Sequence, residues 1–257
     1  MNDYLNQNGL RIRPSEINSI EGYLLYLRHL FAYEYATKTF SNNDKILEIG
    51  CGEGYGTSLI SKGVKEIVSL DVDLKTLKHA REKYGDNCNF VLYDGANLPI
   101  KSDKFDGVVS FQVIEHVRDD SKYVSEILRI LKNDGIFLCT TPNRVYRLKP
   151  GQKPWNPFHL REYYSKDLEN ILKKAFSEVK VVGIRGTDEV QEIEIKRVKQ
   201  RGNVQKILNR IKLIVTNDLS IMPRSGDFIR KYTASDFYIT DNPNEGLDLL
   251  GICRKTD

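Results

Sequence analysis

The chain has 257 residues and a formal net charge of +4, and 40% of its residues are apolar and 29% charged. This balance excludes a disordered or low-complexity chain, and this length fits one large domain or one domain with an insertion. The apolar runs are too short to span a bilayer and the N-terminus lacks the pattern of a secretory signal, so we expect a soluble, cytoplasmic protein. The four cysteines show neither a CxxC pair nor a Cys/His metal spacing, so we expect free thiols and no metal site.

Short apolar runs and helical periodicity alternate along most of the chain. An amphipathic helix is expected first, over Ser19–Phe40. The strands after it are predicted at Lys45–Ile49, Glu66–Asp71, Asn89–Tyr93, Phe105–Phe111, Gly135–Thr140, Val179–Ile184 and Leu247–Cys253. The helices between them are predicted at Tyr55–Ser61, Leu74–Tyr84, Ser121–Leu131 and Lys166–Phe176, the last with Ser165 as its N-cap. This alternation predicts a doubly wound, Rossmann-like α/β fold, whose ligands bind beyond the carboxyl ends of the strands.

Two segments interrupt the alternation. Residues 141–164 contain four prolines, which predicts a loop without a helix. Residues 186–243 form a predicted insertion, in which the part from Ile195 to Tyr232 holds ten Lys or Arg against two Asp. Apolar residues at helical spacing predict an amphipathic helix with a basic face between Val204 and Val215. We therefore expect one domain, made of a helical N-terminal cover (1–40), a ligand-binding core (41–185), the basic insertion (186–243) and the last strand (244–257).

The most informative stretch is a glycine-rich loop, with Gly50, Gly52 and Gly54 directly after the first predicted strand. Glycines let the backbone approach a ligand closely, and the helix that follows offers free N–H groups to an anion. The dinucleotide fingerprint GxGxxG fits poorly, because its third glycine is replaced by Tyr55. Glu48, near the end of the same strand, would repel a pyrophosphate but suits an ammonium or sulfonium group.

Two further acids follow the next strands. Asp71 ends the second predicted strand, where a carboxylate can accept hydrogen bonds from ribose hydroxyls, while Asp73 is the expected N-cap of the next helix. Asp94 follows the third strand, in a position to accept from an exocyclic amine. A ligand with a ribose, an adenine amine and a positive charge is S-adenosylmethionine.

Five segments resemble, in order, the motifs of the class I S-adenosylmethionine-dependent methyltransferases, in particular their small-molecule branch. They read ILEIGCGEGYG, SLDVDLKTLKHA, YDGANLP, FDGVVSFQVIEHV and LRILKNDGIFLCTTPN. The resemblance covers about Phe31–Phe176 and the last strand, and implies a seven-stranded sheet whose last strand is antiparallel. The cofactor-binding residues expected from it are Glu48, Gly50, Cys51, Gly52, Gly54, Tyr55, Asp71, Val72, Asp94, Gly95, Ala96 and Gln112.

The methyl acceptor is expected to bind near His116, just after the fourth strand. An imidazole there could remove a proton, although it could instead cap or pack on the following helix. The aromatic loop Trp155–Tyr164 resembles a segment of family members found among glycan- and sugar-modifying enzymes, which implies a hydroxylated acceptor. We expect Trp155, His159 and Tyr163 of this loop, and Tyr33 of the first helix, to form the acceptor pocket. Alternatively, the loop aromatics only anchor the loop to the core.

The basic insertion leaves other partners open. It could guide an RNA or protein substrate, contact an anionic membrane surface or bind another subunit, including a second copy of the chain, or it could simply be a solvated face. Nucleic acid is disfavoured, because the place where base-directed amino-methyltransferases carry Asn/Asp-Pro-Pro-aromatic reads Ser110-Phe-Gln-Val. A cofactor-binding subunit without turnover is the alternative from another functional class.

Overall fold

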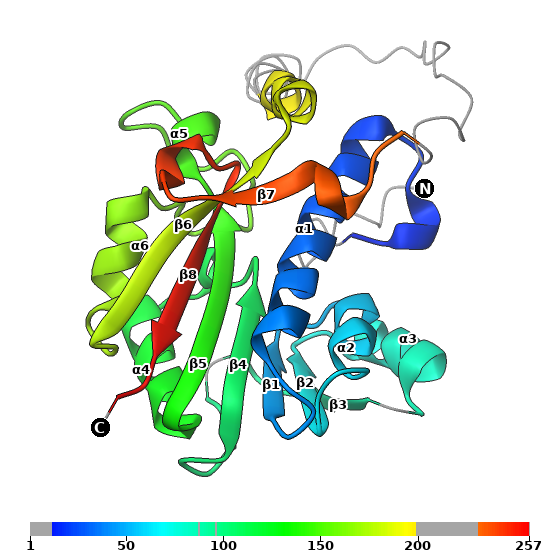
Figure 1. Ribbon diagram of the computed structural model, residues 1–257, viewed down its shortest axis with the longest axis vertical. Helices are drawn as coiled ribbons and strands as arrows, with labels where there is room; N and C mark the ends of the chain where they lie inside the picture. The colour runs from blue at the N-terminus through cyan, green and yellow to red at the C-terminus, as the bar shows by residue number, and fades with distance from the viewer. Residues whose placement is uncertain (1–11, 87, 96, 199–230, 257) are drawn as a thin grey trace.

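The computed structural model describes residues 12–86, 88–95, 97–198 and 231–256. Within these residues one sheet has the strand order β3-β2-β1-β4-β5-β8-β6-β7 (Figure 1). The strands are β1 (Lys45–Ile49), β2 (Glu66–Asp71), β3 (Asn89–Leu92), β4 (Phe105–Phe111), β5 (Leu131–Pro142), β6 (Glu178–Gly186), β7 (Phe237–Thr240) and β8 (Asp248–Arg254). The first five strands pair in parallel, and β8 lies antiparallel between β5 and β6.

The predicted doubly wound fold with an antiparallel last strand is confirmed, but the strand count is wrong. The described residues form eight strands where seven were expected. The additional strand, β7, lies within the predicted insertion and pairs antiparallel with the end of β6, from Gly183 to Gly186. It is only four residues long and follows a charged stretch, so its apolar pattern is too short to identify from sequence.

Helices cover both faces of the sheet. The α-helices are α1 (Ile20–Thr39), α2 (Tyr55–Ile60), α3 (Leu74–Tyr84), α4 (Asp120–Ile130), α5 (Arg144–Arg147) and α6 (Ser165–Leu172), and a further helix covers residues 188–198. The short 3₁₀ helices are η1 (Pro14–Glu16), η2 (Ile114–His116), η4 (Ala234–Asp236) and η5 (Pro243–Glu245). Across the described ranges, no helix combines the length and the apolar character that crossing a bilayer requires.

The side-chain alternation of β1 separates two apolar cores. Ile46 packs on the face covered by α1, α2 and α3, whereas Leu47 and Ile49 pack on the face covered by α4 and α6 (Figure 1). All three side chains are fully buried. Successive residues of a strand point to opposite faces, so a strand buried on both sides has apolar residues at neighbouring positions, as Ile46 and Leu47 show.

The helix ends show which local sequence signals were sufficient to predict where a helix begins. Ser19 caps α1 by accepting from the Gly22 N–H, and Asp73 caps α3 as expected. The prediction that Ser165 caps α6 is wrong, because the helix begins at Ser165 and the Ser165 hydroxyl contacts Asn244 instead. The expectation of a helix-free loop over residues 141–164 is also wrong. One helical turn, α5, forms there because the Asn143 side chain accepts from the Val145 N–H.

The predicted basic insertion is described only at its two ends. Residues 188–198 form a helix, and residues 231–243 contain η4 and β7. The amphipathic helix expected from Val204 to Val215 lies outside the described residues, as does Ala96 of the expected cofactor site.

Candidate active site

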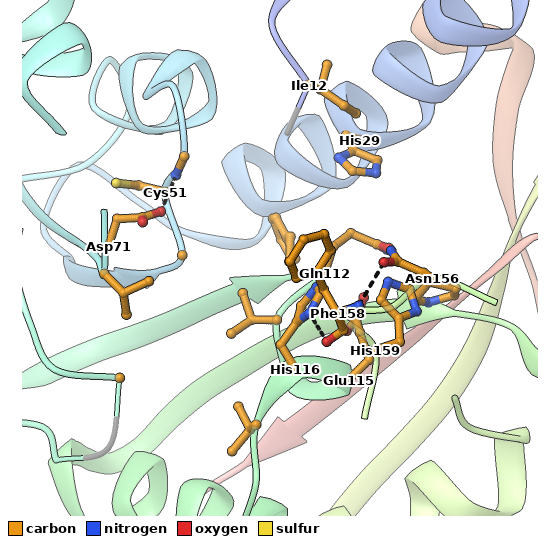
Figure 2. A pocket seen from close by; sticks show the side chains of 18 of the residues that line it. Ile12, His29, Cys51, Asp71, Gln112, Glu115, His116, Asn156, Phe158 and His159 are labelled. Atoms are coloured by element: carbon orange, nitrogen blue, oxygen red, sulfur yellow. Dashed lines mark hydrogen bonds between the residues drawn. The ribbon is translucent and has the colours of Figure 1, made fainter. Parts of the chain in front are cut away.

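A cavity of about 910 Å³ opens beyond the carboxyl ends of β1, β2 and β4. Its volume lies near the upper end of the range of small-molecule sites. One part, the glycine half, is lined by residues 50–53, Asp71, Val72, Asp94 and Gly95. The other part, the histidine half, is lined by Glu115, His116, Trp155, Phe158 and His159 (Figure 2). The two halves are parts of one cavity, so a ligand in the first can reach a ligand in the second.

The glycine-rich loop has the backbone that its sequence predicts. Gly50, Gly52 and Gly54 have φ values of 82°, 51° and 78°, in the left-handed region that favours glycine. A Cβ on Gly50 would lie 2.4 Å from Val113, whereas a Cβ on Gly52 would meet no atom within 4 Å. The Gly52 backbone therefore borders open space, where a ligand can approach it.

Gly54 and Gly52 differ in a way that stability measurements can detect. Gly54→Ala should lower the free energy of unfolding by about 2–4 kcal/mol, through its left-handed backbone and a Cβ 2.9 Å from Ala80 and Phe90. Gly52→Ala should cost only about 1–2 kcal/mol, because the left-handed backbone is its only penalty. Urea unfolding followed by circular dichroism measures both values, and equal losses would contradict this packing argument.

Asp71 connects β2 to the glycine-rich loop. Its Oδ2 accepts from the Gly52 N–H at 2.9 Å, and its Oδ1 accepts from the Asp73 N–H at 3.0 Å. The residue is only 4% exposed but lines the cavity. A carboxylate held in this way orders the loop and borders the glycine half of the cavity.

Val72 and Asp94 both line the glycine half of the cavity. Val72 follows Asp71 and is 48% exposed, so its side chain offers apolar surface to a ligand there. Asp94 is exposed and orders its own turn by accepting from the Asn97 N–H at 2.8 Å. Four other members of the expected cofactor set, Cys51, Tyr55, Gly95 and Gln112, also line the cavity.

Glu48 does not line this cavity, contrary to expectation. Its carboxylate is 1% exposed and accepts hydrogen bonds from the hydroxyls of Tyr33, Thr57 and Ser69. Burial raises the pKa of Glu48 above its ordinary value. Glu48 therefore ties α1, α2 and β2 together behind the loop. Gly54 also lies behind the loop surface, packed against Ala80 and Phe90.

The first helix forms another wall. Tyr33 lines the cavity and packs edge-on against Tyr55 and Phe111, with ring centroids 5.6 and 5.0 Å away. His29 lines the cavity too, and its burial, with the nearby Arg28 and Arg197 charges, lowers its pKa to about 3. His29 is therefore neutral at ordinary pH.

A buried charge network supports this wall. Arg28 donates to Asp248 Oδ2 at 2.8 Å and also pairs with Glu194, which in turn accepts from Arg197 at 2.8 Å. Gln112 Nε2 donates to the same Asp248 oxygen at 3.2 Å, and its φ of 59° turns the chain at the end of β4. The network joins α1, β4, β8 and the helix over residues 188–198. No local sequence signal distinguishes these charges from surface charges, and sequence reasoning missed all but Gln112.

The aromatic loop divides between cavity and core. Trp155 and His159 line the cavity, as predicted, and the Arg147 guanidinium lies 4.3 Å from the Trp155 ring centroid. The Tyr163 side chain does not line it. Tyr163 is 3% exposed, belongs to the core under α4 and α6, and donates to Asp120 Oδ2 at 2.9 Å. Its burial in this core and its hydrogen bond to Asp120 of α4 make it an anchor of the loop.

His116 and His159 face each other across the histidine half, with ring centroids 4.9 Å apart and nearly perpendicular planes. His116 Nδ1 lies 2.8 Å from the Phe158 carbonyl oxygen, and His159 Nδ1 lies 2.9 Å from Glu162 Oε1. Glu115 is fully buried beside them, where burial raises its pKa to about 8. Glu115 was missed by sequence reasoning, although it directly precedes His116 in the fourth motif.

Comparison with known proteins agrees with this geometry. Residues 47–139 match the family described as "Methyltransferase domain". A "probable S-adenosylmethionine-dependent methyltransferase" of Mycolicibacterium smegmatis is 39% identical over 155 residues, which cover 60% of this chain and 59% of the relative. A ubiquinone biosynthesis O-methyltransferase of Dinoroseobacter shibae is 32% identical over 126 residues, covering 46% of this chain and 51% of the relative. The chain thus spans about three fifths or less of the length of these curated relatives.

Solved structures share the fold. A SAM-dependent methyltransferase of Thermotoga maritima superposes with a TM-score of 0.58 at 20% identity, covering 92% of this chain and 95% of that one. A methyltransferase of Mesorhizobium loti does so with a TM-score of 0.52 at 16% identity, covering 87% and 98%. At these identities the likeness concerns the fold alone.

Proposed function

The chain contains a class I S-adenosylmethionine-dependent methyltransferase domain, and we propose that it transfers a methyl group from S-adenosylmethionine to a hydroxyl or amine of a small or glycan-like acceptor. The observation that carries this proposal is the shared cavity. An Asp71-ordered glycine loop lines one half and a cluster of titratable side chains lines the other. The first half suits the cofactor, and the second suits the group that receives the methyl.

Methyl transfer does not require the protein itself to form a covalent bond. The bond between the methyl carbon and the sulfonium sulfur breaks, and its electron pair stays on sulfur. The acceptor oxygen or nitrogen forms the new bond and loses a proton. The protein contributes proximity, alignment and exclusion of water, which together supply most of such a rate enhancement. His116, beside Glu115 in the histidine half, stays the predicted proton acceptor.

Two observations favour a small hydroxylated acceptor. The histidine half is a walled part of the cavity, lined by Trp155 and Phe158, and such walls suit a small molecule. In addition, one of the relatives is named for O-methylation in ubiquinone biosynthesis.

The described part of the basic insertion offers little to a nucleic acid. Arg197 is 7% exposed and pairs with Glu194, and Lys196 pairs with Glu192 at 2.7 Å. These two cations therefore take part in ion pairs within one helix, which weakens the alternative of RNA guidance.

The acceptor class can be tested in two steps. Hydroxylated small molecules and structured RNA are first screened as acceptors of a labelled methyl group, and two variants are then compared on the acceptors that are found. Trp155→Ala should lower turnover of a small acceptor at least about tenfold, because misplacing the acceptor disrupts alignment. A second variant removes six positive charges from the insertion while sparing the buried Arg197, with Gln at Lys196, Lys199, Arg201, Lys206, Arg210 and Lys212. We expect this variant to retain turnover. The reverse pattern would favour RNA or protein, and release of no S-adenosylhomocysteine with any acceptor would favour a non-catalytic subunit.

A further inference from the structure

Glu115, His116 and His159 form a cluster that methyl transfer alone does not account for. Each offers one ligand atom, and these atoms all lie within 4.8 Å of one another. Two ligands of one zinc-sized ion lie up to about 4 Å apart, so a shift of under about 1 Å in the side chains would bring them to a common centre. Both histidines line the cavity, so their side chains have open space on one side for such a shift. The three side chains are drawn together in Figure 2.

The Glu115 carboxylate is the unusual member of this cluster. It is fully buried, its Oε2 accepts from the Thr141 hydroxyl at 3.0 Å, and its Oε1 has no hydrogen-bond partner among the described residues. Nor does it form an ion pair within the described part of the chain. A buried oxygen in this state costs free energy unless a donor or a cation meets it.

The neighbouring cations are already engaged. Arg147 pairs with Glu162 at 2.9 Å, and Arg28 pairs with Asp248 and Glu194. Arg147 attracts the Glu115 carboxylate through space, but its ion pair is with Glu162, so neither cation pairs directly with Glu115 among the described residues. A positive charge between Glu115 and the two histidines would complete the site.

Both imidazoles are oriented as metal-binding histidines are. Nδ1 of His116 donates to the Phe158 carbonyl, and Nδ1 of His159 donates to the Glu162 carboxylate. Each ring therefore has its lone pair on Nε2. A carboxylate behind an imidazole fixes its orientation and makes it a stronger ligand, and Glu162 has this relation to His159. Glu162 is itself paired with Arg147 at 2.9 Å, which keeps its carboxylate behind His159.

We propose that Glu115, His116 and His159 bind one divalent transition-metal cation in the histidine half of the cavity. Two imidazole nitrogens and one carboxylate favour an ion such as Zn²⁺ or Fe²⁺ over Mg²⁺ and Ca²⁺, which prefer all-oxygen ligands. Three protein ligands leave a position open. Resting on the function proposed above, we assign that position to the acceptor oxygen. In this metal-bound form the Nε2 lone pair of His116 is engaged by the cation, so cavity water, in place of His116, takes the proton of the acceptor.

Metal binding is measured directly on untagged, EDTA-treated protein by calorimetric titration with Zn²⁺, and with Mg²⁺ as the comparison ion. The wild-type chain should bind one Zn²⁺, and both Glu115→Gln and His159→Ala should weaken binding by more than the roughly 10–100-fold expected for loss of an outer-shell partner. His79→Ala is the matched control, since His79 is 54% exposed on α3 and outside the cluster, and it should bind Zn²⁺ as the wild type does. Absence of saturable Zn²⁺ binding, or equal loss in all three variants, would overturn the site.

Two further measurements test the metal site separately from the proposed function and from the open coordination position. S-adenosylhomocysteine is titrated into each variant, and it should bind with unchanged affinity because the ligands lie outside the glycine half. If the wild-type chain binds S-adenosylhomocysteine but not Zn²⁺, the metal proposal fails and the proposed function stands. If it binds Zn²⁺ but not S-adenosylhomocysteine, the proposed function fails and the metal site stands. Co²⁺-loaded protein should change its visible absorption when azide is added. An unchanged spectrum would overturn the open position assigned to the acceptor.

Discussion

Replacing Asp71 with Ala should weaken the binding of S-adenosylhomocysteine about 10- to 100-fold, a loss of about 1.4–2.8 kcal/mol. Two effects combine in this loss. The carboxylate no longer orders the loop through the Gly52 N–H, and it no longer accepts from a ribose hydroxyl in the glycine half. A hydrogen bond to a charged group contributes about 1.5–3 kcal/mol, which matches the size of the expected change. Calorimetric titration of wild type and variant measures it.

Asp73→Ala is the control for this prediction. Asp73 carries the same charge two residues away, but it caps α3 through the Lys75 N–H and the Thr76 hydroxyl and does not line the cavity. Its loss should leave the affinity for S-adenosylhomocysteine almost unchanged. Equal weakening in the two variants would show that negative charge alone matters. Tighter binding of NADH than of S-adenosylhomocysteine would show that the ligand of the glycine loop is misassigned.

The largest stability loss is expected for Arg28→Met. Arg28 is 4% exposed and pairs with two carboxylates, Asp248 and Glu194, which are themselves buried. Removing the shared cation leaves Asp248 without an ion pair among the described residues and Glu194 with Arg197 alone, and a broken buried pair costs about 3–5 kcal/mol. Methionine retains most of the volume of the side chain, so the loss reports on charge and not on a cavity. Urea unfolding measures the free energy.

The pH dependence of the stability of Arg28→Met tests whether its loss of stability comes from charge or from packing. Burial already raises the pKa of Asp248, while Arg28 opposes the increase. Without Arg28 the folded-state pKa rises further above the unfolded value, so the folded form takes up a proton more readily than the unfolded form as the pH falls. The loss of stability should therefore be larger at pH 8 than at pH 5. A loss independent of pH would point to packing instead.

A surface ion pair supplies the matched comparison. Lys45 and Glu66 lie 2.8 Å apart with side chains 42% and 39% exposed. Exposed pairs of this kind contribute little, because water and salt screen them and the side chains lose freedom. Lys45→Met should leave the unfolding midpoint unchanged. The contrast between the two Met variants tests whether burial, and not the mere presence of an ion pair, determines the effect of Arg28.

The sequence by itself determined the order of the elements, the glycine-rich loop and the family. Mainly apolar runs such as Lys45–Ile49 and the spacing of Gly50, Gly52 and Asp71 are local patterns, and the backbone obeys them because strand burial and left-handed turns each demand particular residue types. The loop geometry and the place of Asp71 beside it follow from these patterns. The same is true of the cap at Asp73, where one side chain meets its own helix.

Only the tertiary structure decided what surrounds each of these groups. Glu48 reads as a ligand-facing acid, but its direction depends on Tyr33 and Ser69, which approach it from other elements. Tyr163 reads as a pocket residue and is instead held in the core by Asp120. The cluster of Glu115 and His159 exists because a loop after β5 folds over η2, a contact between segments distant in the chain. Local pattern specifies a residue's element and face, whereas its partners depend on long-range packing that no short stretch of sequence contains.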